Sequence, residues 1–176
     1  MQRLKRILIA TGIFLLVMLV IGFLLPNGWQ VERSVVIRAP AAAIFPHINN
    51  LKNWRAWVVW YEQHPDLVTE YSGPDSGVGA TSRWRDEDGR KALKIMQSEK
   101  NHRVDYQVLL NAGISRMDGS LILLPEGTAT RVLWETTGQS GYNLANRYVA
   151  FFQRYKIGSD FDASLQRLQH KIESKN

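Results

Sequence analysis

The sequence predicts an α+β fold, in which an antiparallel sheet has two short helices after its first strand and a long helix at its C-terminal end. One transmembrane helix precedes this arrangement. Three observations lead to the prediction. The run from Ile7 to Leu25 is uninterrupted and apolar. Short segments of alternating polarity follow one another between residues 79 and 137, as in a meander of antiparallel strands. A helical period then recurs from Phe161 to Ile172.

The N-terminal apolar run has nineteen residues and no charged side chain. A helix that crosses a bilayer needs about 20 such residues at 1.5 Å each. Arg3, Lys5 and Arg6 precede the run, and this bias predicts an N-terminus in the cytoplasm. A cleaved signal peptide is the alternative. An uncleaved signal anchor over residues 1–26 is favoured, because the run is longer than the usual signal core and no small-x-small cleavage site follows.

Charge and composition limit the kinds of protein that residues 27–176 can form. The formal net charge is +6, but residues 1–26 hold three basic and no acidic residues, so residues 27–176 keep 19 basic and 16 acidic ones, a net charge of +3. We therefore expect no nucleic-acid partner. Cysteine is absent, which excludes disulfides, thiolate metal sites and a cysteine nucleophile. Residues 27–176 are long enough to bury one core, and one domain is expected there.

The first part of this domain predicts one strand and two short helices. Residues 31–37 are rich in β-branched side chains and roughly alternate, which indicates a strand. Ala39-Pro40 then opens a helical stretch over residues 41–48. Asn49-Asn50 ends it before a second short helical turn that carries Trp54 and Trp57. From there to Asp75 the sequence indicates mainly loop, because Pro65, Gly73 and Pro74 interrupt it.

The second part predicts hairpin-linked strands and a closing helix. The expected strands are residues 79–85, 91–98, 103–110, 116–124 and 128–137. Ser159 and Asp162 resemble the N-terminal cap of a helix whose apolar side chains recur at i, i+4, i+7 and i+11. Before it, residues 143–156 mix apolar, aromatic and basic side chains, which suits an amphipathic helix or turn that leads into the last one.

The order of elements and several short motifs resemble one known superfamily over residues 30–173. The motifs are Val31-Glu32-Arg33-Ser34, Ile37-Arg38-Ala39-Pro40-Ala41 with Ile44-Phe45, Asn49-Asn50-Leu51 with Trp54, Trp57 and Trp60, Tyr71-Ser72-Gly73-Pro74, Gly77-Val78-Gly79-Ala80 with Trp84, and Gly158-Ser159-Asp160-Phe161 with Leu165. Together they are similar to the START-like (SRPBCC, Bet v 1-like) helix-grip superfamily, and within it to the bacterial polyketide cyclase/dehydrase branch.

The resemblance implies a curved antiparallel sheet that grips the last helix, with a cavity between them for an apolar or amphipathic ligand. It implies no reaction, because members of this superfamily include carriers, receptors and enzymes. With the anchor, it implies a single-pass protein of the bacterial inner membrane, bound to the bilayer through residues 7–25, with its C-terminal domain on the extracytoplasmic side.

The candidate ligand-binding groups are tryptophans of the second short helical turn, aromatic side chains on the predicted strands or their approaches, and a cationic helical segment. The candidates are Trp57, Trp60, Tyr71, Trp84, Tyr106, Trp134, Arg147 and Phe151. An inward aromatic side chain can line a cavity or fill it, and the tryptophans around residue 57 are equally consistent with closure of the core. The segment that holds Arg147 can touch lipid, gate the cavity or pack on its own domain.

No motif assigns catalytic, metal or cofactor chemistry. The four histidines lack the spacing of metal ligands. Glu135 and Asp118 lie on predicted strands, where solvated faces explain them better than an acid–base pair. We therefore expect a membrane-tethered binding protein for a lipid, quinone or isoprenoid, more plausibly than an enzyme. The alternatives are a cyclase- or dehydratase-like enzyme that uses Tyr71, Glu135 or Arg147, and an envelope protein–protein interaction module with a filled core.

Overall fold

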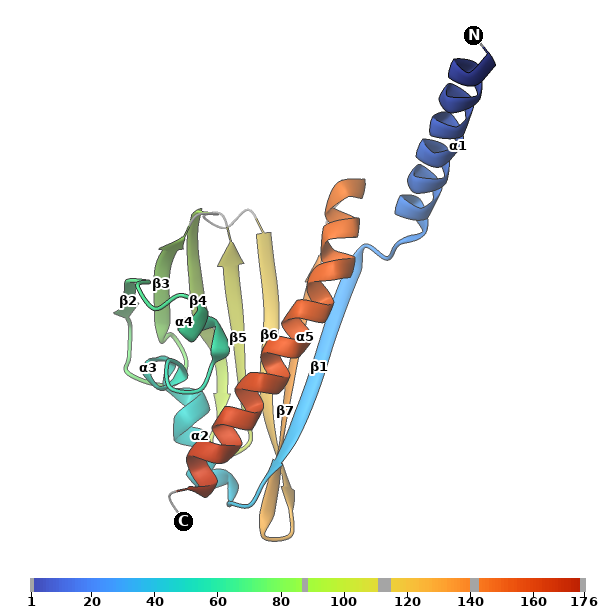
Figure 1. The fold of residues 1–176 in the computed structure, drawn as a ribbon. Coiled ribbons are helices and arrows are strands. Elements are labelled where there is room, and N and C mark those ends of the chain that lie inside the picture. Colours follow the sequence, from blue (N-terminus) through green and yellow to red (C-terminus); the bar gives the residue numbers. More distant parts are fainter. Residues whose placement is uncertain (1, 87–88, 111–114, 140–142, 175–176) are drawn as a thin grey trace.

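A seven-stranded antiparallel sheet, crossed by one long helix, forms the body of the protein (Figure 1). The computed structural model describes residues 2–86, 89–110, 115–139 and 143–174. The elements are α1 (Gln2–Leu24), β1 (Gly28–Ile37), α2 (Ala41–Asn49), α3 (Leu51–Trp54), α4 (Val59–Gln63), β2 (Thr69–Ser72), β3 (Thr81–Asp86), β4 (Gly89–Glu99), β5 (Arg103–Leu110), β6 (Ser115–Glu126), β7 (Ala129–Gln139) and α5 (Leu144–Glu173).

The strand order is β1-β7-β6-β5-β4-β3-β2, so the first strand closes the sheet beside the last one. Every other neighbour pair is a hairpin or sequential connection, as the meander predicted. Arg33 faces Trp134 across the β1–β7 ladder, and Tyr106 faces Gly119 across the β5–β6 ladder. The α+β fold predicted from the sequence is confirmed, including the curved sheet and the long C-terminal helix.

The segment between the first strand and the meander contains more structure than its sequence pattern indicated. The second helical turn is α3, which ends at Trp54, and both α4 and β2 lie in a region predicted to be mainly loop. β2 has only four residues, and Glu70 and Ser72 point to solvent. A strand this short at a sheet edge leaves little periodic signal, because pairing with β3 rather than local pattern defines it.

Helix α5 is continuous from Leu144 to Glu173, so the helix start expected at Ser159 is wrong. The helix begins where the Asn143 side chain accepts a hydrogen bond from the backbone N–H of Ala145 at 2.9 Å. The Gly-Ser-Asp signature has another use. The guanidinium of Arg33 lies against Gly158, where an added Cβ would come within 2.4 Å of Nη2, and its Nε donates to Asp162 at 2.9 Å. The signature therefore marks where α5 crosses β1.

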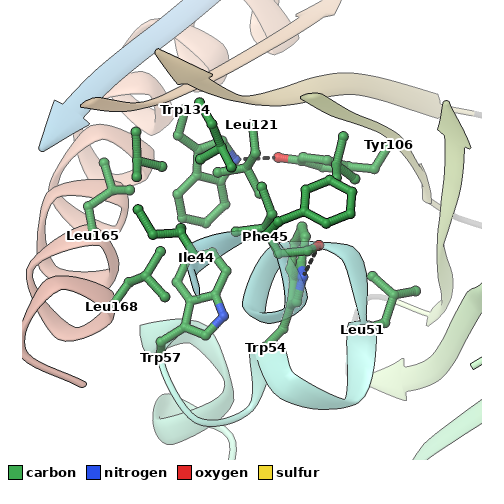
Figure 2. Close-up of a cluster of buried hydrophobic side chains, with 14 of the residues drawn as sticks. Ile44, Phe45, Leu51, Trp54, Trp57, Tyr106, Leu121, Trp134, Leu165 and Leu168 are labelled. Carbon is green, nitrogen blue, oxygen red and sulfur yellow. Dashed lines mark hydrogen bonds between the residues drawn. The ribbon is translucent and has the colours of Figure 1, made fainter. Parts of the chain in front are cut away.

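The core lies between the sheet and the C-terminal half of α5, and the short helices close it (Figure 2). Ile44 and Ile48 of α2 are fully buried, as are Leu165 and Leu168 of α5. The buried indole N–H of Trp54 donates to the carbonyl oxygen of Ile48 at 2.9 Å. Because this polar group is satisfied, Trp54 can fill the core without a desolvation cost.

Helix α1 stands apart from the sheet and is apolar on all sides (Figure 1). Among the described residues it is the one helix that is long and apolar enough to cross a membrane, a test that a signal sequence also passes. Gly22 is its buried residue, and it lies against Leu144 and Tyr148 of α5. The end of α1 therefore contacts the start of α5.

Candidate ligand-binding site

A stacked pair of aromatic rings fills the middle of the space between sheet and helix. The rings of Trp134 on β7 and Phe161 on α5 are parallel within 7° and their centroids are 3.8 Å apart. Trp134 Nε1 donates to the Tyr106 hydroxyl at 2.8 Å (Figure 2). Trp57 packs on the other side of Trp134, with ring centroids 5.3 Å apart. These side chains form a packed floor rather than the wall of an open cavity.

The Tyr106 ring occupies space next to its cross-strand partner Gly119, where a side chain would not fit. An added Cβ at Gly119 would come within 2.3 Å of the Tyr106 Cζ, so glycine is required there. Burial of Tyr106 raises the pKa of its hydroxyl far above the ordinary value of 10, although the bond from Trp134 lowers it somewhat. The phenol therefore stays neutral at physiological pH and serves as a structural hydrogen-bonding group.

One open groove, of about 1210 Å³, lies where α4 and the loop after it face β2, β3 and β4. The indole rings of Trp60 and Trp84 lie 5.1 Å apart along its wall. The imidazole of His64 packs on Trp60 at 4.8 Å, and Leu67 and Val68 extend the apolar lining. This wall offers flat aromatic surface to a ligand.

A charged pair lies in the same groove beside the aromatic wall. Lys91 Nζ and the Asp86 carboxylate are 2.7 Å apart, and their side chains are only 15% and 13% exposed. Lys91 is the cross-strand partner of Trp84 in the β3–β4 ladder, so the ammonium and the indole share one face of the sheet. The groove therefore combines an aromatic wall with this partly buried ion pair and with further charged side chains, among them Glu70, Arg83 and Arg90.

A second open groove, of about 1140 Å³, lies between the N-terminal half of α5 and the ends of β1, β5, β6 and β7. Trp29, Leu110 and Met117 line its sheet side, and Asn146, Ala150 and Gln153 line its helix side. The Trp29 indole lies flat on Gly138, where an added Cβ would come within 2.5 Å of Cζ2. Leu109 contributes to both grooves.

Both grooves lie toward the same end of the strands, the second next to α1 and the first at the opposite edge of the sheet, beside β2. β3 ends there at Asp86, β5 ends there at Leu110, and β1 and α5 both begin there (Figure 1). The opposite end is closed by α2 and the C-terminal turns of α5. The second groove is therefore the one that lies beside the apolar N-terminal helix.

The structure distributes the candidate residues over four places. Trp60 and Trp84 line the first groove, whereas Trp57, Tyr106 and Trp134 are buried in the floor. Tyr71 lies in a separate pocket of about 60 Å³ next to Leu51 and Ala80. Arg147 and Phe151 lie on α5 outside both grooves, where Arg147 contacts α1 and Phe151 contacts Arg154.

Sequence reasoning missed Trp29, Met117 and the Asp86–Lys91 pair. Trp29 follows the same alternation as Val31 and Arg33 on β1, so extension of the strand by two residues would have placed it on the inner face. The position of Met117 follows equally from the alternation of β6. The ion pair had no local signal, because the register of the β3–β4 hairpin brings its two members together.

The acidic residues of the described strands do not form a reactive pair. Asp118 accepts a hydrogen bond from Gln107 at 2.9 Å, and Glu135 lies 3.9 Å from Arg103. Within the described ranges, no group of three or more histidine, aspartate or glutamate side chains could hold a metal ion. The geometry at the grooves suits binding of an uncharged or amphipathic molecule by shape and aromatic contact.

A curved antiparallel sheet that holds a long C-terminal helix, with a groove between them and another beside the short helices, defines the helix-grip class of ligand-binding folds. The chain belongs to the family described as polyketide cyclase / dehydrase and lipid transport, whose model matches residues 28–173. The superfamily expected from the sequence motifs is thereby confirmed. A search of curated proteins found no match.

Solved structures show the same fold at low sequence identity. A truncated norcoclaurine synthase from Thalictrum flavum has a TM-score of 0.61 at 11% identity, with 82% of this chain and 93% of that chain covered. TTHA0849 from Thermus thermophilus has a TM-score of 0.60 at 15% identity, with 84% and 99% covered. DynU16, from the dynemicin biosynthetic locus, has a TM-score of 0.58 at 14% identity over 84% of this chain. The match spans 48% of the DynU16 chain.

Proposed function

We propose that this protein is a membrane-tethered binding protein for a hydrophobic or amphipathic small molecule of the lipid, quinone or isoprenoid class. The ligand lies on the inner side of the sheet, in the groove between the sheet and α5 or in the groove between α4 and β2–β4. Residues 1–26 are the anchor and residues 27–176 the binding domain, on the extracytoplasmic side of a bacterial inner membrane. The family's ligand-binding fold and the apolar α1 both support this proposal.

The observation that carries the proposal is the presence of two large open grooves, the second of which lies next to α1. Pockets for small molecules commonly measure about 300–1000 Å³, and each groove here exceeds that range, at about 1210 and 1140 Å³. A long amphipathic molecule therefore fits better than a small metabolite. The Asp86–Lys91 pair lies beside the indole of Trp84, which suits a ligand with one polar end.

The connection between anchor and domain is short. α1 ends at Leu24 and β1 begins at Gly28, and the three intervening residues span at most about 10 Å at ~3.3 Å each. The domain cannot travel away from the membrane that holds α1. Exchange of a ligand must therefore occur with the adjacent leaflet or with a partner that comes to it.

Titration of the full-length protein, in detergent micelles, with a fluorescent fatty acid tests the proposal. We expect saturable binding with one site per chain. Trp60→Ala or Trp84→Ala should weaken it about tenfold, which corresponds to ~1.4 kcal/mol, whereas Leu124→Ala, at the other end of the sheet, should leave it unchanged. Absence of saturable binding would contradict the proposal.

The enzymatic alternative finds less support in the geometry. Tyr71, Glu135 and Arg147 were the polar groups considered for a cyclase-like reaction. Tyr71 lies in the small separate pocket, Glu135 lies near Arg103 on β5, and Arg147 contacts the end of α1. Three groups in three places cannot act on one substrate atom. If no apolar ligand binds, the function that remains is a protein–protein interaction module with a filled core.

A further inference from the structure

The N-terminal half of α5 carries an apolar stripe that the domain itself does not cover. Leu144, Tyr148, Phe151 and Tyr155 recur at i, i+4, i+7 and i+11 and so share one face of the helix. The first two lie against Gly22 of α1. The stripe then continues past this contact, and Tyr155 and the neighbouring Phe152 are 60% and 67% exposed. Single exposed apolar residues are common, but a contiguous exposed patch of them marks an interaction site.

The start of α5 is fixed beside the last turns of α1. Arg147 Nη1 donates to the carbonyl oxygens of Phe23 and Leu25 at 3.3 and 3.2 Å, and the Tyr148 hydroxyl donates to the carbonyl oxygen of Met18. The last carbonyls of a helix lack intrahelical partners and carry partial negative charge. A guanidinium at this place satisfies them and offsets that charge.

These contacts set the depth of α5 relative to α1. Met18 precedes the end of α1 at Leu24 by six residues, about 9 Å at 1.5 Å per residue. If α1 spans a bilayer, its last 9 Å lie near the boundary between the hydrocarbon and the headgroups. The first turn of α5 lies at the same level.

The basic side chain beside the stripe is of the kind expected at the depth of the lipid headgroups. The Arg154 guanidinium lies 4.2 Å from the ring centroid of Phe151 and 5.0 Å from that of Tyr155. Within the described part of the chain, Arg154 has no carboxylate partner, whereas Lys156 bonds Asp160 at 2.8 Å. Aromatic side chains beside an unpaired arginine are typical of a helix that lies in the membrane interface, where the arginine contacts lipid phosphates.

We propose that residues 144–155 of α5 form a second membrane-binding surface, which lies in the headgroup layer of the leaflet next to the domain. The stripe contacts the upper acyl chains, and Arg154 binds phosphate groups of the lipids. Asn146, Ala150 and Gln153 on the neighbouring face line the second groove, so that groove opens at the leaflet. This inference rests on the membrane tether of the proposed function, and it adds the orientation in which the groove meets lipid.

Single cysteines test the surface cleanly because the chain has none of its own. Phe152→Cys and Tyr155→Cys, each with a nitroxide label, are placed in the full-length protein in liposomes that contain anionic phospholipid. Gln166→Cys, exposed farther along α5, is the aqueous control, and Phe14→Cys is the buried membrane control. We expect the labels at 152 and 155 to collide with dissolved oxygen at a several-fold higher rate than the label at 166. Their collision rate with a water-soluble nickel reagent should be several-fold lower.

In the Arg147→Ala background, the readings at 152 and 155 should shift toward the aqueous value while that at 14 stays unchanged. Aqueous readings at 152 and 155 in the parent protein would overturn the inference, and a protein partner would then become the occupant of the stripe. The label at 14 separates this outcome from loss of the tether itself. Fatty-acid binding to the same samples reports separately on the proposed function.

Discussion

Three large side chains of this domain pack against glycines, which have no Cβ to exclude them. Tyr106 lies against Gly119, Trp29 lies on Gly138 and Arg33 lies on Gly158. In each case a large side chain occupies the volume that a Cβ would take. The sequence shows the glycines and the aromatics, but only the register of the strands and the crossing of α5 bring each pair together.

Gly119→Ala tests this dependence at one residue. The new Cβ would come within 2.3 Å of Tyr106 Cζ, and such overpacking costs about 1–3 kcal/mol of unfolding free energy. Gly28→Ala is the matched control on β1, where the added Cβ meets only a backbone oxygen at 3.7 Å, and its effect should stay within ~0.5 kcal/mol. Denaturant titrations of both variants measure the difference. Equal stabilities would show that Tyr106 is not held as described.

Tyr106 also predicts a dependence of stability on pH. Burial raises the pKa of its hydroxyl above the value of 10 that the unfolded chain has. Folding therefore favours the neutral phenol, and the stabilisation is complete below pH 10 and declines as pH rises above it. Unfolding titrations from pH 8 to 11.5 should show this decline. Tyr106→Phe should make it shallower, and an unchanged slope would argue against a buried phenol. Tyr61 and Tyr71, whose pKa values burial also raises, contribute to the decline that remains.

At the scale of elements, α5 is one helix with two halves of different character. From Phe161 to Ile172 it packs into the core, and from Leu144 to Tyr155 it contacts α1 and presents exposed aromatic side chains. The sequence pattern separated these halves, because the core-facing period begins only at Phe161. It could not show that they are continuous, since the cap-like Ser159 lies in the middle of the helix.

The two halves predict opposite effects of truncation to alanine. Leu168→Ala should cost about 2–5 kcal/mol of unfolding free energy, because Leu168 is fully buried in the core. Tyr155→Ala should change it by less than ~0.5 kcal/mol, because the ring has no core contact. Thermal or denaturant unfolding in detergent checks both. A cost above ~2 kcal/mol at Tyr155 would indicate a packing role that the structure does not show.

The strands were predictable because each alternates locally, and the limits of the strand at residues 103–110 agree with those of β5. The grooves were not predictable in the same way. Alternation places Trp84 and Trp134 on the inner face alike, yet Trp134 is covered by Phe161, and Trp84 lines an open groove. Which aromatic fills the space and which lines it depends on the distance of α5 from the sheet, a property of the tertiary structure.

At the scale of the whole molecule, three features distinguish one end of the domain from the other. An apolar helix leads into the domain within a few residues, both large grooves lie toward that end of the strands, and the core fills the opposite end. This arrangement supports the proposal that the domain exchanges its ligand with a membrane that α1 spans. Electrostatics add little to that picture, because residues 27–176 carry a net charge of only +3.

Native mass spectrometry of the full-length protein, released from membranes and followed by organic extraction of the same sample, tests the central claim most directly. The account predicts one apolar molecule per chain, retained in the parent protein and in Leu124→Ala, and lost or strongly reduced in the Trp60→Ala, Trp84→Ala double variant. An unliganded parent protein that also fails to bind added fatty acid, quinone or isoprenoid would contradict it, and would indicate an interaction module with a filled core instead.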